Sequence, residues 1–298
     1  MDVVTMSKRD ISDLETQDNN SLIQWPAPAK INWFLHIIGK RQDGYHNLQT
    51  VFQFLDYGDQ MTFQITDDGK ISRDYEFGFD EQTDISMQAA TELATYTSDS
   101  VGVRIGLTKK LPIGGGLGGG SSNAATTLIA LNKLWNIGLE RHQLAKIGLK
   151  LGADVPVFVM GHSAWAEGVG ERLTPIQLDE CWFLVVNPNI HVSTAKIFAH
   201  KHLTQAPEMM KIRALENGID FGFGENQLEQ NVRTEYPEVD AIFKWLNNHG
   251  QPRMSGSGGS VFMPINDREF GERLLKNKPK DLIGFVAKGL NRHPLIDI

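Results

Sequence analysis

Six glycines fall within seven consecutive residues of the stretch LPIGGGLGGGSSNAAT, Leu111 to Thr126. Glycine-rich segments that open a helix bind phosphate well, because backbone N–H groups can approach the anion and the helix N-terminus adds partial positive charge. A strand-like segment, 101–111, precedes the run, and a segment with helical spacing follows it. A mobile glycine linker is seldom framed in this way, so the pattern predicts a phosphate-binding loop.

Two well-known phosphate motifs do not fit this loop. The Walker A pattern G-x-x-x-x-G-K-[ST] needs a lysine where this chain has Gly120 or Ser121. A dinucleotide site needs, besides its glycines, an acidic residue after the next strand, roughly 20 residues on. Glu140 is the nearest candidate, but it follows a predicted helix.

Gly114, Gly116 and Gly119 satisfy the string G-x-G-x-x-G, which by itself is weak evidence for a dinucleotide site. A third type of loop carries serines where Walker A has its lysine. In such a loop the hydroxyls of Ser121 and Ser122 would cap the following helix or reach a magnesium ion, while the glycines wrap a triphosphate.

Two ionisable residues stand in segments suited to phosphoryl transfer. In LGADVPVF, Asp154 follows a helix-ending glycine and precedes Val155-Pro156, a pattern typical of an N-cap aspartate. The local sequence leaves open whether this carboxylate only caps a helix or also acts in catalysis. In PAPAKIN, Lys30 is either a solvated lysine or a site cation, and Asn32 projects from the same strand face. A cation beside a carboxylate would stabilise a transferring phosphoryl group.

Other motifs carry aromatic and acidic side chains. Tyr45 and His46 follow an Asp-Gly turn in DGYHNL, and on local evidence ordinary packing explains them as well as ligand binding. Glu167 and Glu171 in AEGVGE would either assist a magnesium ion or be solvated turn carboxylates.

The bulk composition excludes several classes of protein. The chain has 298 residues and a formal net charge of −7, which argues against binding to nucleic acid or to an anionic membrane. Its single cysteine, Cys181, allows no disulfide framework within one chain. No apolar run reaches the roughly 18 to 20 residues that span a bilayer. Residues 1–20 have no hydrophobic signal region and are expected to form a disordered polar tail, and the expected compartment is the cytoplasm.

Strand-like and helix-like segments alternate without a regular βαβ rhythm, which predicts an α+β fold rather than a doubly wound parallel sheet. We expect strands at 23–25, 31–39, 48–55, 61–66, 101–111, 181–188 and 284–290, and helices at 86–96, 123–135, 142–152 and 236–248. A domain boundary is expected near 174–179.

Five motifs in order along the chain resemble those of the GHMP kinases, the superfamily that includes galactokinase, homoserine kinase and mevalonate kinase. The motifs are PAPAKINWFLHIIGKRQDGYHNLQTVFQFLDYGD, LPIGGGLGGGSSNAAT, LGADVPVF, AWAEGVGE and MSGSGGSVF. The last is more usually T-G-T-G-A-C, and Ser255 keeps the hydroxyl of the first threonine. The resemblance implies a two-domain GHMP-kinase fold of mixed and antiparallel sheets with helices. Residues 21–175 would form the ATP-binding N-terminal domain and 176–298 the C-terminal domain, with the active site in the cleft between them.

Among GHMP kinases the motifs are most similar to those of members that phosphorylate the 2-hydroxyl of a cytidine diphosphate-linked methylerythritol, in non-mevalonate isoprenoid synthesis. The resemblance implies ATP as co-substrate, with Mg²⁺ expected. It assigns catalysis to Lys30 and Asp154, Asp154 being the base, and substrate contacts to Asn32. The cytosine ring would lie between Tyr45 and Phe198, with His46 bonded to the base and Thr194 nearby. The ATP contacts would come from Pro112, Ile113, Gly114, Gly115, Gly116, Leu117, Gly118, Gly119, Gly120, Ser121 and Ser122.

Two alternatives stay open at this point. One is a GHMP kinase acting on homoserine, mevalonate or a sugar, substrates for which an aromatic clamp on a nucleobase would have no purpose. The other is a nucleotide-dependent regulatory protein that has lost catalysis, which the presence of both Lys30 and Asp154 disfavours. The sequence predicts neither the metal ligands nor whether the protein is a monomer or a homodimer.

Overall fold

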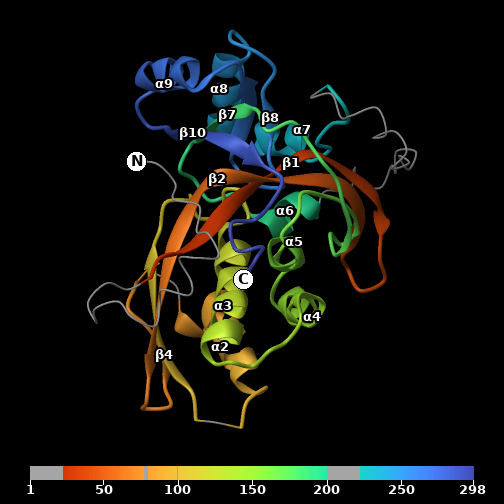
Figure 1. The fold of residues 1–298 in the computed structure, drawn as a ribbon. Helices are drawn as coiled ribbons and strands as arrows, with labels where there is room; N and C mark the ends of the chain where they lie inside the picture. The colour runs from red at the N-terminus through yellow and green to blue at the C-terminus, as the bar shows by residue number, and fades with distance from the viewer. Residues whose placement is uncertain (1–22, 77–79, 99, 200–221) are drawn as a thin grey trace.

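The computed structural model describes residues 23–76, 80–98, 100–199 and 222–298, which form a mixed β-sheet with helices packed against it (Figure 1). The strands are β1 (Trp25–Lys40), β2 (His46–Thr66), β3 (Ile71–Arg73), β4 (Gly102–Thr108), β5 (Ala164–Gly168), β6 (Arg172–Pro175), β7 (Trp182–Asn187), β8 (Arg253–Met254), β9 (Val261–Ile265) and β10 (Ile283–Leu290). The helices are η2 (Glu81–Thr83), α2 (Ile85–Ala94), α3 (Gly119–Leu134), α4 (Arg141–Leu151), α5 (Val155–Met160), α6 (Thr194–Phe198), α7 (Glu229–Glu235), α8 (Pro237–Leu246) and α9 (Arg268–Lys276). The α+β prediction is confirmed.

The hairpin of β1 and β2 is the longest feature of the sheet. The sequence predicted four shorter strands over this region, and the structure joins them into two, because β-bulges interrupt the pairing without ending it. One bulge lies between Pro28, which has no N–H to donate, and Lys30. Gly58 lets the strands approach closely, since a Cβ there would lie 2.2 Å from the carbonyl oxygen of Ala27.

The sheet runs in the order β3-β4-β2-β10-β7-β9-β8, and β2 also pairs with β1 and β5. Only the β3–β4 pair is parallel among the described strands. β10 connects the two ends, because it pairs along its length with β7 and at Gly289 and Leu290 with β2. The first and last thirds of the chain therefore share one sheet.

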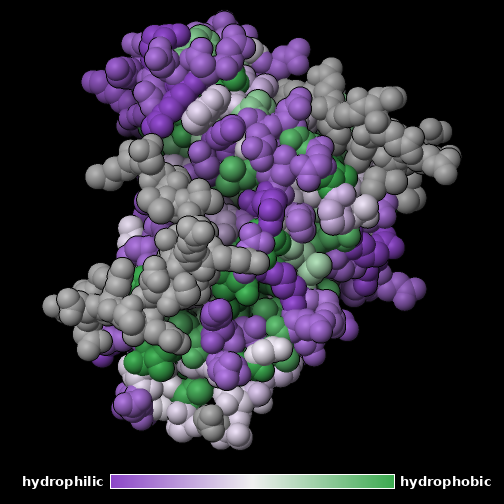
Figure 2. All heavy atoms as spheres, in the orientation of Figure 1, coloured by the Kyte–Doolittle hydropathy of each residue, from purple (hydrophilic) through white to green (hydrophobic). Residues whose placement is uncertain are grey.

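Two groups of helices lie at opposite ends of the molecule, with β1 and β2 between them (Figure 1). One group, α2 to α5, buries apolar stripes against β1, β2 and β4, and α3 contributes Ala124, Leu128 and Leu131. The other group, α7 to α9, packs on β7 and β9. Figure 2 shows hydrophilic side chains over α9, which carries ion pairs between Arg268 and Glu272 and between Arg273 and Glu269. Within the described residues, no helix is long and apolar enough to cross a membrane.

The last residues of the chain return to the core of the first group. Leu295 is fully buried there, and Arg141 donates hydrogen bonds to the carbonyl oxygens of Val159, Leu295 and Ile296. Burial, with the nearby Arg141 charge, lowers the pKa of His293 to about 3, so this histidine is neutral at physiological pH. The C-terminal segment thus stabilises the helices that carry the glycine loop and Asp154. The domain limits given above stay predictions.

Candidate functional site

The glycine loop connects β4 to α3. Its glycines at 114, 116 and 118 have positive φ angles, a conformation that favours residues without a Cβ. Gly118 is the N-cap of α3, so the helix begins four residues before the predicted start at Asn123. A Cβ on Gly118 would lie 2.8 Å from the ring of Phe158 and 3.1 Å from Cε of Lys30. The loop is therefore packed closely against the catalytic candidates.

A cavity of about 320 Å³ opens over this loop and the first turn of α3. Residues 112–121, all predicted to hold ATP, line it. Ser122, the remaining predicted residue, lies in the first turn of α3 and is fully buried, and its hydroxyl has no hydrogen-bond partner among the described residues. Ile85, Leu107 and Lys109 also line it, beside the polar residues Thr83, Asp84 and Ser86. Backbone N–H groups, a helix N-terminus and the apolar side chains of Ile85 and Leu107 together suit a nucleoside triphosphate.

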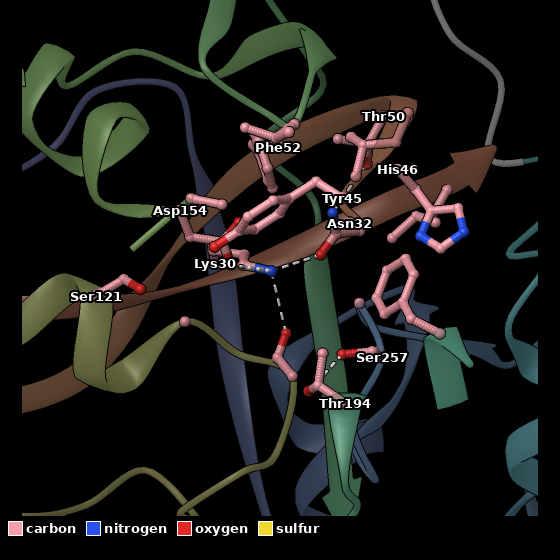
Figure 3. A pocket seen from close by; sticks show the side chains of 18 of the residues that line it. Lys30, Asn32, Tyr45, His46, Thr50, Phe52, Ser121, Asp154, Thr194 and Ser257 are labelled. Atoms are coloured by element: carbon pink, nitrogen blue, oxygen red, sulfur yellow. Dashed lines mark hydrogen bonds and ion pairs between the residues drawn. The ribbon is translucent and has the colours of Figure 1, made fainter. Parts of the chain in front are cut away.

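A second cavity of about 580 Å³ adjoins the first (Figure 3). Both predicted catalytic residues and all five predicted substrate residues line it: Lys30, Asp154, Asn32, Tyr45, His46, Thr194 and Phe198. Gly116, Gly118 and Ser121 line both cavities, so the glycine loop is their common wall. A phosphate chain in the first cavity would end where the second begins.

Lys30 lies at this junction and is only 2% exposed. Its Nζ donates to Asn32 Oδ1 at 2.6 Å and to the Gly116 carbonyl oxygen at 3.2 Å, and it pairs with Asp154 Oδ2 at 3.1 Å (Figure 3). The ring of Phe52 lies 5.2 Å from the ammonium, a cation–π contact. The cation therefore links strand β1, the glycine loop and the start of α5, unlike a solvated surface lysine.

Asp154 occupies the N-cap position of α5, as its sequence context predicted, but its side chain makes no capping hydrogen bond. The carboxylate is 32% exposed and faces Lys30 in the cavity. The alternative that this aspartate only caps a helix is thereby disfavoured, since its oxygens remain available to a ligand and to the lysine.

Aromatic side chains also line this cavity. The rings of His46 and Phe198 lie 5.5 Å apart at an angle of 31°, and Tyr45 is 62% exposed. Burial and the nearby Lys40 charge lower the pKa of His46, so its imidazole is mainly neutral at pH 7 and can both donate and accept a hydrogen bond. The hydroxyl oxygens of Thr194 and Ser257, which both line this cavity, lie 2.9 Å apart.

Several residues of the site were not predicted from the sequence. Thr50 accepts a hydrogen bond from the side-chain amide of Asn32 at 2.9 Å, which orients that amide. Phe52 contacts Lys30, and Ser257 lines the cavity from the MSGSGGSVF motif. Because MSGSGGSVF is one of the five recognised motifs, the sequence did carry a signal for Ser257. Thr50 and Phe52 also lie in a recognised motif, 26–59, but within it they have the pattern of ordinary strand residues, so nothing singled them out.

The two acidic side chains at the β5–β6 turn line neither cavity, although Val169 of the same turn lines the larger one. Glu167 accepts a hydrogen bond from the Gln49 side chain, and Glu171 accepts one from the Val169 amide at 2.6 Å. Within the part of the chain that the structure describes, no three His, Cys, Asp or Glu side chains are grouped as a metal site. The solvated-turn interpretation of these glutamates is favoured over a metal-binding one.

Comparisons with known proteins point in one direction. The family model for the GHMP kinases N terminal domain matches residues 84–162, and that for the GHMP kinases C terminal domain matches residues 207–277. A 4-diphosphocytidyl-2-C-methyl-D-erythritol kinase of Marinobacter nauticus is 48% identical over 92% of this chain and 96% of its own length. The enzyme of that name from Thiobacillus denitrificans is 47% identical over 92% of this chain and 97% of its own.

Solved structures resemble the whole described fold. A crystal structure of 4-(cytidine 5'-diphospho)-2C-methyl-D-erythritol kinase superposes with a TM-score of 0.75 at 27% identity, covering 90% of this chain and 99% of the other. A mevalonate kinase of Methanococcus jannaschii superposes with a TM-score of 0.66 at 17% identity, covering 92% and 100%. The second likeness concerns the fold alone.

Proposed function

The chain belongs to the GHMP kinase family of ATP-dependent phosphotransferases, and from this premise we propose that it transfers the γ-phosphoryl group of ATP to the 2-hydroxyl of 4-diphosphocytidyl-2-C-methyl-D-erythritol. The products are the 2-phosphate and ADP, and the step belongs to the non-mevalonate route to isoprenoid precursors. Relatives that carry this enzyme's name match nearly the whole chain, which supports the substrate.

The junction of the two cavities supplies the chemistry. In the proposed complex, the acceptor hydroxyl lies beside Asp154, which takes its proton as the oxygen attacks the γ-phosphorus. Lys30 stabilises the charge on the transferring group, and the contacts of its ammonium keep it in place without reorganisation. The accepting hydroxyl is tertiary and hindered. Positioning by Lys30, Asn32 and Asp154 therefore accounts for a large share of the rate.

The proposed cytidyl subsite is formed by Tyr45, His46 and Phe198. Every base has a π-face and stacks on aromatic rings, so Tyr45 and Phe198 can enclose the cytosine. His46 lies against Phe198 in the structure and can bond the polar edge of the base. Thr194 is in reach of the same ligand, since its hydroxyl faces the cavity beside Ser257.

We expect Mg²⁺ to enter with ATP. The described residues hold no carboxylate cluster, which fits a metal held mainly by phosphate oxygens and water. Ser121, which lines both cavities, is the protein oxygen we propose as a ligand. When bound, the ion would neutralise negative charge on the phosphate chain.

The buried Lys30, joined to Asp154, Asn32 and the glycine loop where the cavities meet, is the observation that carries this proposal. The test is ADP release from Mg·ATP with and without the cytidyl diphosphate alcohol, with homoserine, mevalonate and galactose in parallel. Turnover only with the cytidyl substrate is expected. Turnover with one of the other alcohols instead would assign the chain to another GHMP kinase, and no turnover with any would favour a regulatory protein.

The domain limits at 21–175 and 176–298 and a cytoplasmic location are part of the same proposal. The expected assembly, a monomer or a homodimer, is also part of it.

A further inference from the structure

Asp59 is a carboxylate that the proposed mechanism does not use. It lies in β2, opposite Ala27 of β1, and is fully buried. Its Oδ1 accepts hydrogen bonds from the backbone amides of Lys110 at 2.7 Å and Leu111 at 2.9 Å, and its Oδ2 pairs with the ammonium of Lys109. One buried side chain thus binds three consecutive residues.

Those three residues lead directly into the glycine loop, which begins after Leu111. A carboxylate buried without partners would be strongly unfavourable, whereas here both oxygens are satisfied and the charge is matched. The bonds to two successive amides fix the backbone at the entrance to the loop. The bond to Lys109 fixes a cation.

Lys109 faces the nucleotide cavity, whereas Asp59 does not line it. The lysine side chain is 17% exposed, and its Nζ lies 3.1 Å from the position that a Cβ on Gly119 would occupy. Gly119 is the first residue of α3, where unpaired backbone N–H groups carry partial positive charge. An ammonium is repelled from such a helix terminus unless a carboxylate holds it there.

We propose that Asp59 is a positioning residue for the nucleotide, which holds the Lys109 ammonium beside the N-terminal turn of α3 so that both meet the phosphate chain of a nucleoside triphosphate. This inference rests on the proposed function only in taking the cavity over the glycine loop as the ATP site. It does not depend on which alcohol is phosphorylated.

The test is calorimetric titration of Mg·ATP without any alcohol substrate. Asp59→Asn keeps an oxygen for the amides of Lys110 and Leu111 but removes the charge that holds Lys109. Lys109→Met keeps the aliphatic stem and removes the ammonium. Each change is expected to raise the Kd for Mg·ATP about tenfold, since bonds to charged groups contribute more than neutral ones. The Kd of the double variant should be no higher than the higher of the two single-variant values, because both changes break the same ion pair.

A matched control is Lys110→Met. This neighbouring lysine bonds Asp59 through its backbone amide, and its side chain lines a different cavity between β1, β2 and α9, so the Kd should be unchanged. In the full assay, kcat at saturating ATP and the KM for the alcohol should stay within about twofold for Asp59→Asn.

An unchanged Kd in Lys109→Met overturns the proposal, and this variant settles the matter even where Asp59→Asn does not fold. Additive losses in the double variant would also overturn it, because they would mean that Asp59 does not act through Lys109. A drop in kcat with unchanged ATP binding would place Asp59 in the catalytic step instead.

Discussion

The two cavities are built in opposite ways. The nucleotide side is formed mostly by one continuous stretch, residues 112–121, and offers backbone N–H groups in left-handed turns. The alcohol side is assembled from side chains on β1, β2, α6 and the loops around Asp154 and Gly256, which are far apart in the sequence. We therefore expect the nucleotide cavity to bind its ligand mainly through main-chain groups, and the alcohol cavity mainly through individual side chains.

This difference predicts different sensitivities. A loop that binds through its backbone should bind its ligand more weakly when a Cβ is added, whereas changes to the side chains facing the alcohol should affect one ligand or one step at a time. Lys30 belongs to both halves, since it bonds the Gly116 carbonyl and pairs with Asp154. The following variants test whether the halves can be separated.

Asp154→Asn should have the largest effect. The change keeps the size of the side chain but removes its ability to accept a proton, so kcat should fall about 10²- to 10⁴-fold, the usual range for general-base catalysis. Nucleotide binding, measured by titration, should change by no more than about twofold, because the glycine loop is intact. Asp281→Asn, at an exposed site outside both cavities, is the control. A near-normal kcat would remove Asp154 from the role of base.

Phe198→Ala should act on the alcohol side alone. Stacking on a base contributes about 1 to 3 kcal/mol, so the KM for the cytidyl substrate should rise roughly 5- to 150-fold. The KM for ATP should not follow it. Phe270→Ala removes a similar half-buried ring from α9, away from both cavities, and should leave both constants unchanged. Equal increases for the two substrates would contradict an aromatic clamp on the base.

Gly114→Ala should have the smallest effect and act on the nucleotide side. Gly114 has a φ of 68°, and a non-glycine residue in this left-handed conformation costs about 1 to 2 kcal/mol. If the loop changes shape to avoid that conformation, the KM for ATP would rise roughly 5- to 30-fold. Gly138→Ala is the control for the backbone conformation alone, because Gly138 has a φ of 76° and open space around it, whereas a Cβ on Gly114 would also lie 2.7 Å from His191 Nδ1. In a denaturant titration Gly138→Ala should lower unfolding stability by no more than Gly114→Ala does, and it should leave the KM unchanged. A raised KM for the alcohol alone would contradict the division into halves.

Much of the fold could be predicted from local patterns. The stripe on α3 and the buried run of β7 marked their elements, because burial of one face repeats at the period of the backbone. The joining of predicted strands into β1 and β2 could not be predicted, since it depends on bulges opposite specific partners. The pairing of β10 with β2 was also beyond local patterns, because it depends on contacts between distant segments.

The sequence by itself determined the family, and it predicted the phosphate-binding loop and the other candidate residues, because each lies in a contiguous motif. Only the tertiary structure decided that Lys30 contacts Asp154 rather than water, that this aspartate leaves its helix uncapped, and that Asp59 holds Lys109 beside α3. The physical reason is that a motif records which groups are available, whereas their charges and hydrogen bonds act over a few ångströms in space. Folding brings residues more than a hundred positions apart, such as Lys30 and Asp154, within that distance.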